Sequence, residues 1–219
     1  MDNSIVSNWN EKHLKYAKTD WIDKPTLFAE WALQFLPQDG GSMLELGCGQ
    51  GQDSRFFAEK GFIIDALDFS FEGLNLAQTK TPAELVPKIS YEQIDISYPL
   101  PFNDDAYDVV YSHLALHYFD ERTTHQIFDE IYRVMRTGGV IAIMLNSTSD
   151  EEFNAGPKIE KDFFMIDGME KRYFNIESLT PFVNRFKRIV LDDKGELLKH
   201  KIGGERKRGG LIRFVGQKV

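Results

Sequence analysis

Three glycines at alternate positions are the clearest chemical signal in this sequence. Gly47, Gly49 and Gly51 follow an apolar run and precede a segment with helical spacing. Glycine lets the backbone turn sharply and approach a ligand closely, and the N–H groups at a helix start favour anionic or polar ligand groups. The pattern therefore predicts a binding loop for a nucleotide-like cofactor.

The spacing of these glycines separates the cofactor classes. The dinucleotide fingerprint is G-x-G-x-x-G, and with Gly47 and Gly49 as its first pair the third glycine falls at position 52, which is Gln. The observed pattern is instead G-x-G-x-G, with Glu45 two residues before it. Because Glu45 lies between two leucines, its carboxyl needs a partner if it is buried. The spacing weakens the dinucleotide interpretation.

The segments that must position this loop alternate between strand and helix patterns. Such alternation is typical of an α/β fold with a mostly parallel sheet covered by helices. In such a sheet ligands bind at the carboxyl ends of the strands, and the first strand-to-helix turn is the usual site. We expect a turn at 193–195. The predicted strands are 42–47, 62–68, 89–94, 107–112, 139–145, 187–192 and 210–217, and the predicted helices are 26–36, 52–60, 120–135 and 176–186.

Residues 40–146 resemble the class I S-adenosylmethionine-dependent methyltransferases. Leu44–Gly51 matches the first motif of that family, an acidic residue followed by G-x-G-x-G, and Asp68 stands where the family has an acidic residue ending the second strand. Segments 93–96, 107–113 and 133–141 resemble its later motifs in order. The resemblance implies a Rossmann-like three-layer sandwich, with a mostly parallel seven-stranded sheet whose last strand is antiparallel, as a single domain over residues 1–219.

The resemblance also implies a role for each polar residue near the loop. Asp68 would accept hydrogen bonds from both ribose hydroxyls of S-adenosylmethionine, Asp95 would accept one from the adenine amino group beside Ile96, and Glu45 would help hold the amino group, directly or through water. Asp65 is the alternative to Asp68, but a mid-strand carboxylate does not reach the crevice. The expected cofactor-binding residues are Glu45, Gly47, Cys48, Gly49, Gly51, Asp68, Phe69, Asp95, Ile96 and Ser112.

Two histidines just past the fourth predicted strand are candidates for a catalytic base. Methyl transfer from a sulfonium is an in-line displacement that requires no metal and no covalent nucleophile, and it leaves S-adenosylhomocysteine as product. An acceptor that carries a proton benefits from a general base, and histidine, with an ordinary pKa near 6.5, suits that task. His113 is expected nearest the methyl group, followed by His117; packing is the alternative interpretation of both. We interpret Asp108 and the Cys48 thiol as structural.

The composition narrows the classes of partner that this protein is expected to bind. A net charge of −8 and a pI near 5.2 argue against a nucleic-acid partner, because binding to nucleic acid depends on clustered Lys and Arg. No apolar run approaches the roughly 20 residues of a membrane span, and the N-terminus lacks a signal-peptide pattern. Cys48, the single cysteine, excludes an internal disulfide. We expect a cytoplasmic monomer or homodimer that acts on a small molecule.

Two segments flank the predicted site. Residues 1–38 are expected to form an N-terminal helical cap, with Trp9, Tyr16 and Trp21 folding over the cofactor or simply packing. Residues 147–175 are polar and irregular, with scattered aromatics, and are too long for a routine connection. They are expected to form a lid or a substrate wall, with a surface insertion as the alternative.

Three other functions stay open at this point. The acceptor can be a protein or RNA; against this, Ser112–Ala115 stands where amino-methylating nucleic-acid enzymes of this fold carry an Asn-Pro-Pro-Tyr type motif. The protein can also bind the cofactor without catalysis, since fold does not dictate function. A nicotinamide-dependent oxidoreductase is disfavoured by Gln52.

Overall fold

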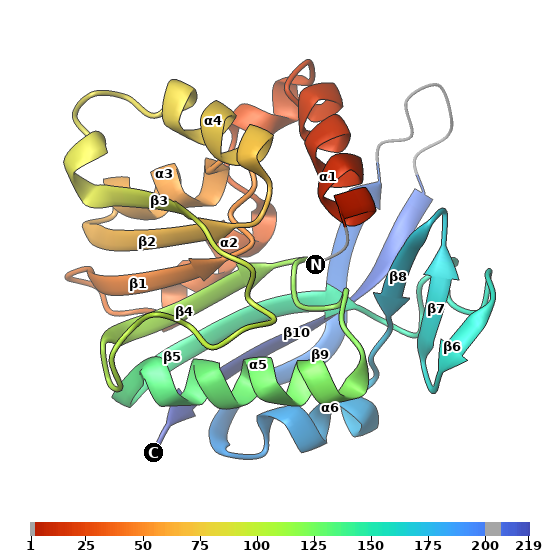
Figure 1. Cartoon of the computed structure of the whole chain (residues 1–219). Helices are drawn as coiled ribbons and strands as arrows, with labels where there is room; N and C mark the ends of the chain where they lie inside the picture. The colour runs from red at the N-terminus through yellow and green to blue at the C-terminus, as the bar shows by residue number, and fades with distance from the viewer. Residues whose placement is uncertain (1–2, 200–206) are drawn as a thin grey trace.

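The fold is built on one mixed sheet. The computed structural model describes residues 3–199 and 207–219, with the side chains of 3–5, 20, 21, 196–199 and 207–209 left out of the description. In this part of the chain seven strands form a sheet in the order β3-β2-β1-β4-β5-β10-β9 (Figure 1). The strands are β1 (Gly41–Leu46), β2 (Phe62–Asp68), β3 (Ile89–Gln93), β4 (Tyr107–His113), β5 (Met135–Asn146), β9 (Phe186–Lys199) and β10 (Lys207–Lys218).

The sheet topology confirms the predicted fold class. β1 pairs in parallel with β2 on one side and with β4 on the other, and the last strand, β10, is antiparallel to both β5 and β9. The strand order therefore reverses at β1. In open α/β sheets this reversal leaves a crevice at the carboxyl ends of the strands, directly after Leu46 and His113.

Helices cover both faces of the sheet. Apolar side chains of α2, α3 and α4 pack on one face in a cluster with Tyr111, and those of α5 and α6 pack on the other in a cluster with Val110. The bounds are α1 (Asn3–Tyr16), η1 (Asp20–Asp23), α2 (Leu27–Ala32), η2 (Leu33–Phe35), α3 (Gln52–Glu59), α4 (Phe71–Lys80), η3 (Val86–Lys88), α5 (Glu121–Val134) and α6 (Ile176–Val183).

Local sequence explains where these helices begin. The Asp120 side chain accepts a hydrogen bond from Thr123 N at 2.6 Å and caps α5, and Ser70 caps α4 by accepting one from Gly73 N at 3.0 Å. Such caps satisfy N–H groups that have no partner within the helix. Because Ser70 follows Asp68 by two residues, the cap also fixes α4 directly beyond the end of β2.

The C-terminal hairpin differs from the sequence prediction. Residues 193–195, predicted as a turn, lie within β9, where Gly195 pairs with Leu211 of β10. The register shifts between Leu211 and Arg213, and Arg213 forms a two-pronged ion pair with Asp192 at 2.8 and 2.9 Å. The irregularity absorbs the turn-forming residues without ending the strand.

Residues 147–175 fold into a small sheet of their own. Three antiparallel strands, β6 (Lys158–Glu160), β7 (Phe163–Ile166) and β8 (Met169–Arg172), lie beside the main sheet (Figure 1). Arg172 joins them to the segment after β4, because its N–H donates to His117 O at 2.7 Å and its Nε to Phe119 O at 3.0 Å. The insertion is thus fixed next to the predicted site.

Candidate functional site

The turn between β1 and α3 has a shape that suits glycine. Gly47, Gly49 and Gly51 have φ angles of 76°, 54° and 69°, a region that other residues rarely adopt. A Cβ atom on Gly47 would overlap the side chain of Ala115, and one on Gly51 would overlap the hydroxyl of Tyr91. The loop therefore requires glycine both for its conformation and for the close approach of its neighbours.

The glycine loop is tied to the end of β2. The N–H groups of Gly47 and Cys48 both donate to Leu67 O, at 2.8 and 2.9 Å. The next N–H along the loop, that of Gly49, donates to Asp68 Oδ2 at 2.8 Å. The Cys48 thiol is buried, and burial raises its pKa well above the ordinary value, as expected for a packing residue.

Asp68 connects three segments through one carboxylate. While Oδ2 accepts from Gly49, Oδ1 accepts from Ser70 N at 2.8 Å, at the start of α4. Burial raises the pKa of Asp68, and the nearby His13 and the backbone N–H groups oppose that rise. The Phe69 N–H also favours the ionised carboxylate, and the two oxygens together still have acceptor capacity for a further donor. Asp65, the alternative, accepts instead from the Tyr107 hydroxyl at 2.7 Å.

Glu45 is a buried carboxyl with a hydroxyl partner. Only 3% of the residue is exposed, and the Ser54 hydroxyl donates to its Oε2. Burial, together with the charge of Asp53, raises its pKa to about 8. Glu45 is therefore mostly protonated at neutral pH, and a cation placed beside it would favour its ionised form.

Asp53 is a buried carboxylate that the sequence analysis missed. It accepts hydrogen bonds from Thr26 N at 2.7 Å, from the Thr26 hydroxyl at 2.8 Å and from the Tyr111 hydroxyl at 2.7 Å. These bonds join α3 to the start of α2 and to β4. Asp53 therefore anchors the helix that follows the glycine loop.

The other predicted cofactor residues lie at neighbouring strand ends. Ile94 N donates to Asp68 O at 3.1 Å, which places the segment of Asp95 and Ile96 next to the end of β2. Asp95 accepts from the N–H and hydroxyl of Ser97, at 3.0 and 2.7 Å. Ser112, fully buried, donates to Leu46 O at 2.8 Å and so joins β4 to the end of β1.

Helix α1 packs over the glycine loop. The His13 imidazole lies so close to Gly49 and to Gly73 that a Cβ atom on either would press against it. Gln50 Nε2 donates to His13 O at 2.8 Å, and the Ser70 hydroxyl donates to Asn10 Oδ1 at 2.7 Å. Figure 1 shows α1 between α4 and the small β6–β8 sheet. Helix α1 thus packs against the glycine loop and the start of α4.

Aromatic rings on α1 face the site. The Trp9 ring meets Phe69 edge-on at 6.5 Å and Tyr118 edge-on at 5.2 Å. Tyr16, on the same helix, meets His13 edge-on at 6.4 Å. The Trp21 side chain lies outside the described residues. Trp9 therefore bridges two predicted regions, the end of β2 and the segment after β4.

The two candidate bases occupy different environments. His113 is half-buried at the end of β4, its ring stacked on Phe28 at 6.0 Å, and burial lowers its pKa so that it is neutral at pH 7. His117 is 2% exposed, with its ring 4.2 Å from that of Tyr118. Neither side chain has a role that geometry alone fixes. Asp108, as expected, is structural: it binds the N–H and hydroxyl of Ser42 and pairs with Arg136.

Polar side chains lie where α1 meets the insertion. The Lys12 ammonium of α1 contacts the thioether of Met169 on β8. Close by, Lys171 pairs with Glu152 at 2.8 Å, and the Tyr173 hydroxyl lies 3.4 Å from the same carboxylate. The aromatic residues of the insertion mostly form its own core, since Phe164 and Tyr173 are buried together with Ile166 and Phe153.

The structure brings the predicted cofactor residues to one edge of the sheet, and it adds α1 to them. Sequence reasoning missed Asn10, His13 and Asp53, because isolated polar residues in helical segments carry no signal of burial. Among the residues that the structure describes, no three metal-ligating side chains gather, and no helix is long and apolar enough to cross a bilayer.

Comparison with known proteins shows what this chain is similar to. The model of a family described as a methyltransferase domain matches residues 44–143. The malonyl-[acyl-carrier protein] O-methyltransferase of Pectobacterium atrosepticum is 36% identical over 114 residues, which cover 52% of this chain and 42% of the relative. The chain therefore spans less than half the length of that relative.

Solved structures extend the likeness to the whole fold. TehB from Haemophilus influenzae superimposes with a TM-score of 0.71 at 18% identity, over 96% of this chain and 67% of the other. The 1,6-didemethyltoxoflavin-N1-methyltransferase of Burkholderia thailandensis, solved with S-adenosylhomocysteine bound, gives a TM-score of 0.70 at 16% identity, over 98% of this chain and 87% of the other. At these identities the likeness shows the fold.

Proposed function

We propose that this chain is a class I S-adenosylmethionine-dependent methyltransferase and that it transfers the methyl group of S-adenosylmethionine to a small-molecule acceptor. The observation that carries the proposal is the bond between Gly49 and Asp68, which unites the glycine loop with an acidic strand end. Bound there, the cofactor supplies an electrophilic methyl group that an acceptor displaces in line.

The residues at this edge fit that cofactor. The loop has no room for Cβ atoms at Gly47 and Gly51, so its backbone can follow a ligand closely. Asp68 would accept from the ribose hydroxyls with the lone pairs that the backbone leaves open, and Glu45 would hold the amino group. Phe69 and Ile96 would flank the adenine, with Asp95 accepting from its amino group. Each charge-assisted bond is worth about 1.5–3 kcal/mol.

Chain residues around the acceptor position would exclude water and handle the proton. α1, with Trp9 over Phe69 and Tyr118, would close the site from the N-terminal side, and the β6–β8 insertion would form the substrate wall. His113 is our first candidate for the general base, because burial keeps its imidazole neutral and able to accept a proton from a hydroxyl or amine. His117 is the second.

A small-molecule acceptor is supported by charge. The net charge of −8 opposes a phosphate backbone, and the relative named above acts, by its name, on malonyl-[acyl-carrier protein], in which a small malonyl group is attached to a carrier protein. The same net charge supports the proposal that the protein does not bind nucleic acid. A monomer or homodimer and a cytoplasmic location complete the proposal.

Calorimetry with S-adenosylmethionine, S-adenosylhomocysteine and NAD tests the cofactor. We expect saturable binding of both sulfur ligands and none of NAD. Tight NAD binding without a response to the sulfur ligands would overturn the proposal. Release of S-adenosylhomocysteine in the presence of a pool of small acceptors then tests turnover; binding without release from any acceptor class, including protein and RNA, would leave a non-catalytic binding protein in its place.

A further inference from the structure

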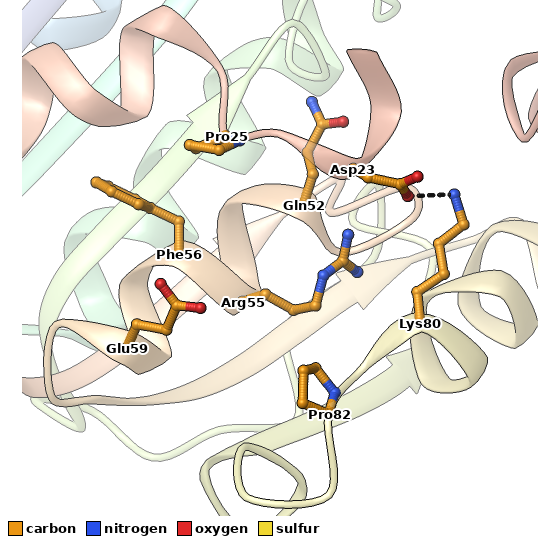
Figure 2. A pocket seen from close by; sticks show the side chains of 8 residues that line it. All are labelled: Asp23, Pro25, Gln52, Arg55, Phe56, Glu59, Lys80 and Pro82. Carbon is orange, nitrogen blue, oxygen red and sulfur yellow. Dashed lines mark hydrogen bonds and ion pairs between the residues drawn. The ribbon is translucent and has the colours of Figure 1, made fainter. Parts of the chain in front are cut away.

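A second hollow lies on α3, apart from the proposed cofactor residues. It has a volume of about 530 Å³, within the range of small-molecule sites (Figure 2). One wall is the face of α3 that carries Arg55 and Phe56, and the others come from the chain before α2 and from the end of α4. Its lining residues are Asp23, Pro25, Gln52, Arg55, Phe56, Glu59, Lys80 and Pro82.

Arg55 is a buried cation in this cavity, near enough to Asp23 to help lower the pKa of that carboxyl. It is only 9% exposed, and its Nη1 donates to Gln50 O at 2.8 Å. In the part of the chain whose side chains are described, no carboxylate lies within ion-pair distance of it. A guanidinium has five N–H donors, so most of its capacity faces the cavity, where Figure 2 shows it pointing between Gln52 and Lys80.

The rest of the lining defines what a ligand must carry. Gln52 Oε1 has no hydrogen-bond partner among the described residues, but it is buried from solvent and so is not presented to a ligand in the cavity. Lys80 is already paired with Asp23 at 2.7 Å. Phe56 and the two prolines provide apolar surface. The lining therefore suits a compact molecule that carries an oxyanion and some apolar surface.

We propose that this cavity is a second binding site, for a small metabolite whose carboxylate or phosphate group pairs with Arg55. A planar guanidinium binds either oxyanion with two parallel hydrogen bonds. The burial of Arg55 strengthens this pairing relative to a surface arginine.

Arg55 connects the cavity to the glycine loop. Arg55 Nη1 donates a hydrogen bond to Gln50 O, and the Gln50 side-chain amide donates one to His13 O of α1. A ligand that draws the guanidinium into the cavity competes with Gln50 O, so it loosens both the loop and the cap. Occupancy of the cavity should therefore weaken binding at the loop, a coupling that rests on the proposed function, whereas oxyanion binding itself does not.

Titration with inorganic phosphate and, separately, with succinate tests the site without any cofactor. We expect calorimetry to show saturable one-to-one binding of at least one probe. The probe that binds shows whether the site prefers a phosphate or a carboxylate. Arg55→Lys should weaken it about tenfold because the fork is lost. Glu59→Lys should tighten it about threefold to tenfold, because a carboxylate in the lining becomes a cation. The matched control is Glu121→Lys, on the exposed start of α5 across the sheet, which should leave affinity within twofold.

Three results would overturn the proposal: no saturable binding of either probe, equal tightening by Glu59→Lys and Glu121→Lys, or unchanged affinity in a folded Arg55→Lys protein. Because Glu59→Lys predicts a gain, misfolding cannot imitate it. The coupling has its own readout: saturating probe should raise the dissociation constant of S-adenosylhomocysteine at least twofold. An unchanged dissociation constant would contradict the coupling but not the second binding site. Failure of S-adenosylhomocysteine to bind at all would contradict the proposed function alone.

Discussion

Asp68 accepts a hydrogen bond from the backbone N–H of Gly49 at 2.8 Å. The bond joins a loop whose shape depends on glycine to an acidic residue from the next strand. With the bond from Ser70 N to the other oxygen, it holds the carboxylate in one orientation before any ligand arrives. Such preorganisation lowers the entropy that binding must overcome.

Asp68→Ala should lower affinity for S-adenosylhomocysteine by at least about 100-fold, because two charge-assisted hydrogen bonds worth about 1.5–3 kcal/mol each are lost. The measurement is calorimetry on the folded variant. Asp65→Asn is the matched control on the same strand, since Asp65 binds the Tyr107 hydroxyl, and it should change affinity less than twofold. Equal losses in the two variants would remove Asp68 from the ribose site.

Affinity for S-adenosylhomocysteine should rise between pH 6 and 8. Glu45 is protonated below its pKa of about 8, and the ligand ammonium binds its ionised form, so binding releases a proton in this range. Proton release is measured by calorimetry in buffers of different ionisation enthalpy. Glu45→Gln, which cannot ionise, should flatten the pH profile; a profile with the same slope in that variant would assign the proton to another group.

The same carboxyl should lower stability as pH rises. The pKa of Glu45 is higher in the folded protein than its ordinary value of 4.5, so the folded state holds a proton that the unfolded state has released. The free energy of unfolding therefore falls from about pH 4.5 until it levels near pH 8. Urea denaturation of the wild type and of Glu45→Gln across this range isolates the contribution.

Gly47→Ala should destabilise the fold by more than a simple backbone penalty. A positive φ costs an L-residue about 1–2 kcal/mol, and here the added methyl also overlaps Ala115. Gly138→Ala is the control, because Gly138 has a φ of 86° but open space around it. Urea denaturation should show a smaller loss there, and Ala115→Gly should restore part of the loss in Gly47→Ala; absence of rescue would mean that the overlap is relieved elsewhere.

Asn10→Ala should loosen α1 from the site. The variant removes the acceptor of the Ser70 hydroxyl, at a cost of about 1 kcal/mol, so amide exchange in α1 should accelerate and S-adenosylhomocysteine should dissociate several times faster. Glu11→Ala, an exposed neighbour on the same helix, is the control. If both variants behave alike, the cap does not depend on this contact.

The sheet was predictable because its signals are local. Buried parallel strands such as β2 and β4 are short apolar runs with clear ends, so their bounds are confirmed within a residue or two. The turn predicted at 193–195 was wrong because pairing with β10 overrides turn propensity there. The β6–β8 sheet has strands of three or four residues, too short to show a period.

The residues of the candidate site also divide into those that a sequence pattern predicts and those that it does not. Gly47, Asp68 and Asp95 stand at strand ends, where the topology itself brings them together. Arg55 and His13, by contrast, are buried by contacts between segments far apart in the chain, and in sequence they look like ordinary polar residues on helix surfaces. Burial of that kind follows from tertiary packing, which no local pattern reports.

The position of β10 imposes an order on folding. Since β10 lies between β5 and β9, neither strand can complete its pairing until residues 207–218 have left the ribosome. Until then β5, apolar along Val140–Leu145, is an open edge, and such edges favour association between nascent chains. The strand that covers this edge is therefore made after every other strand of the sheet.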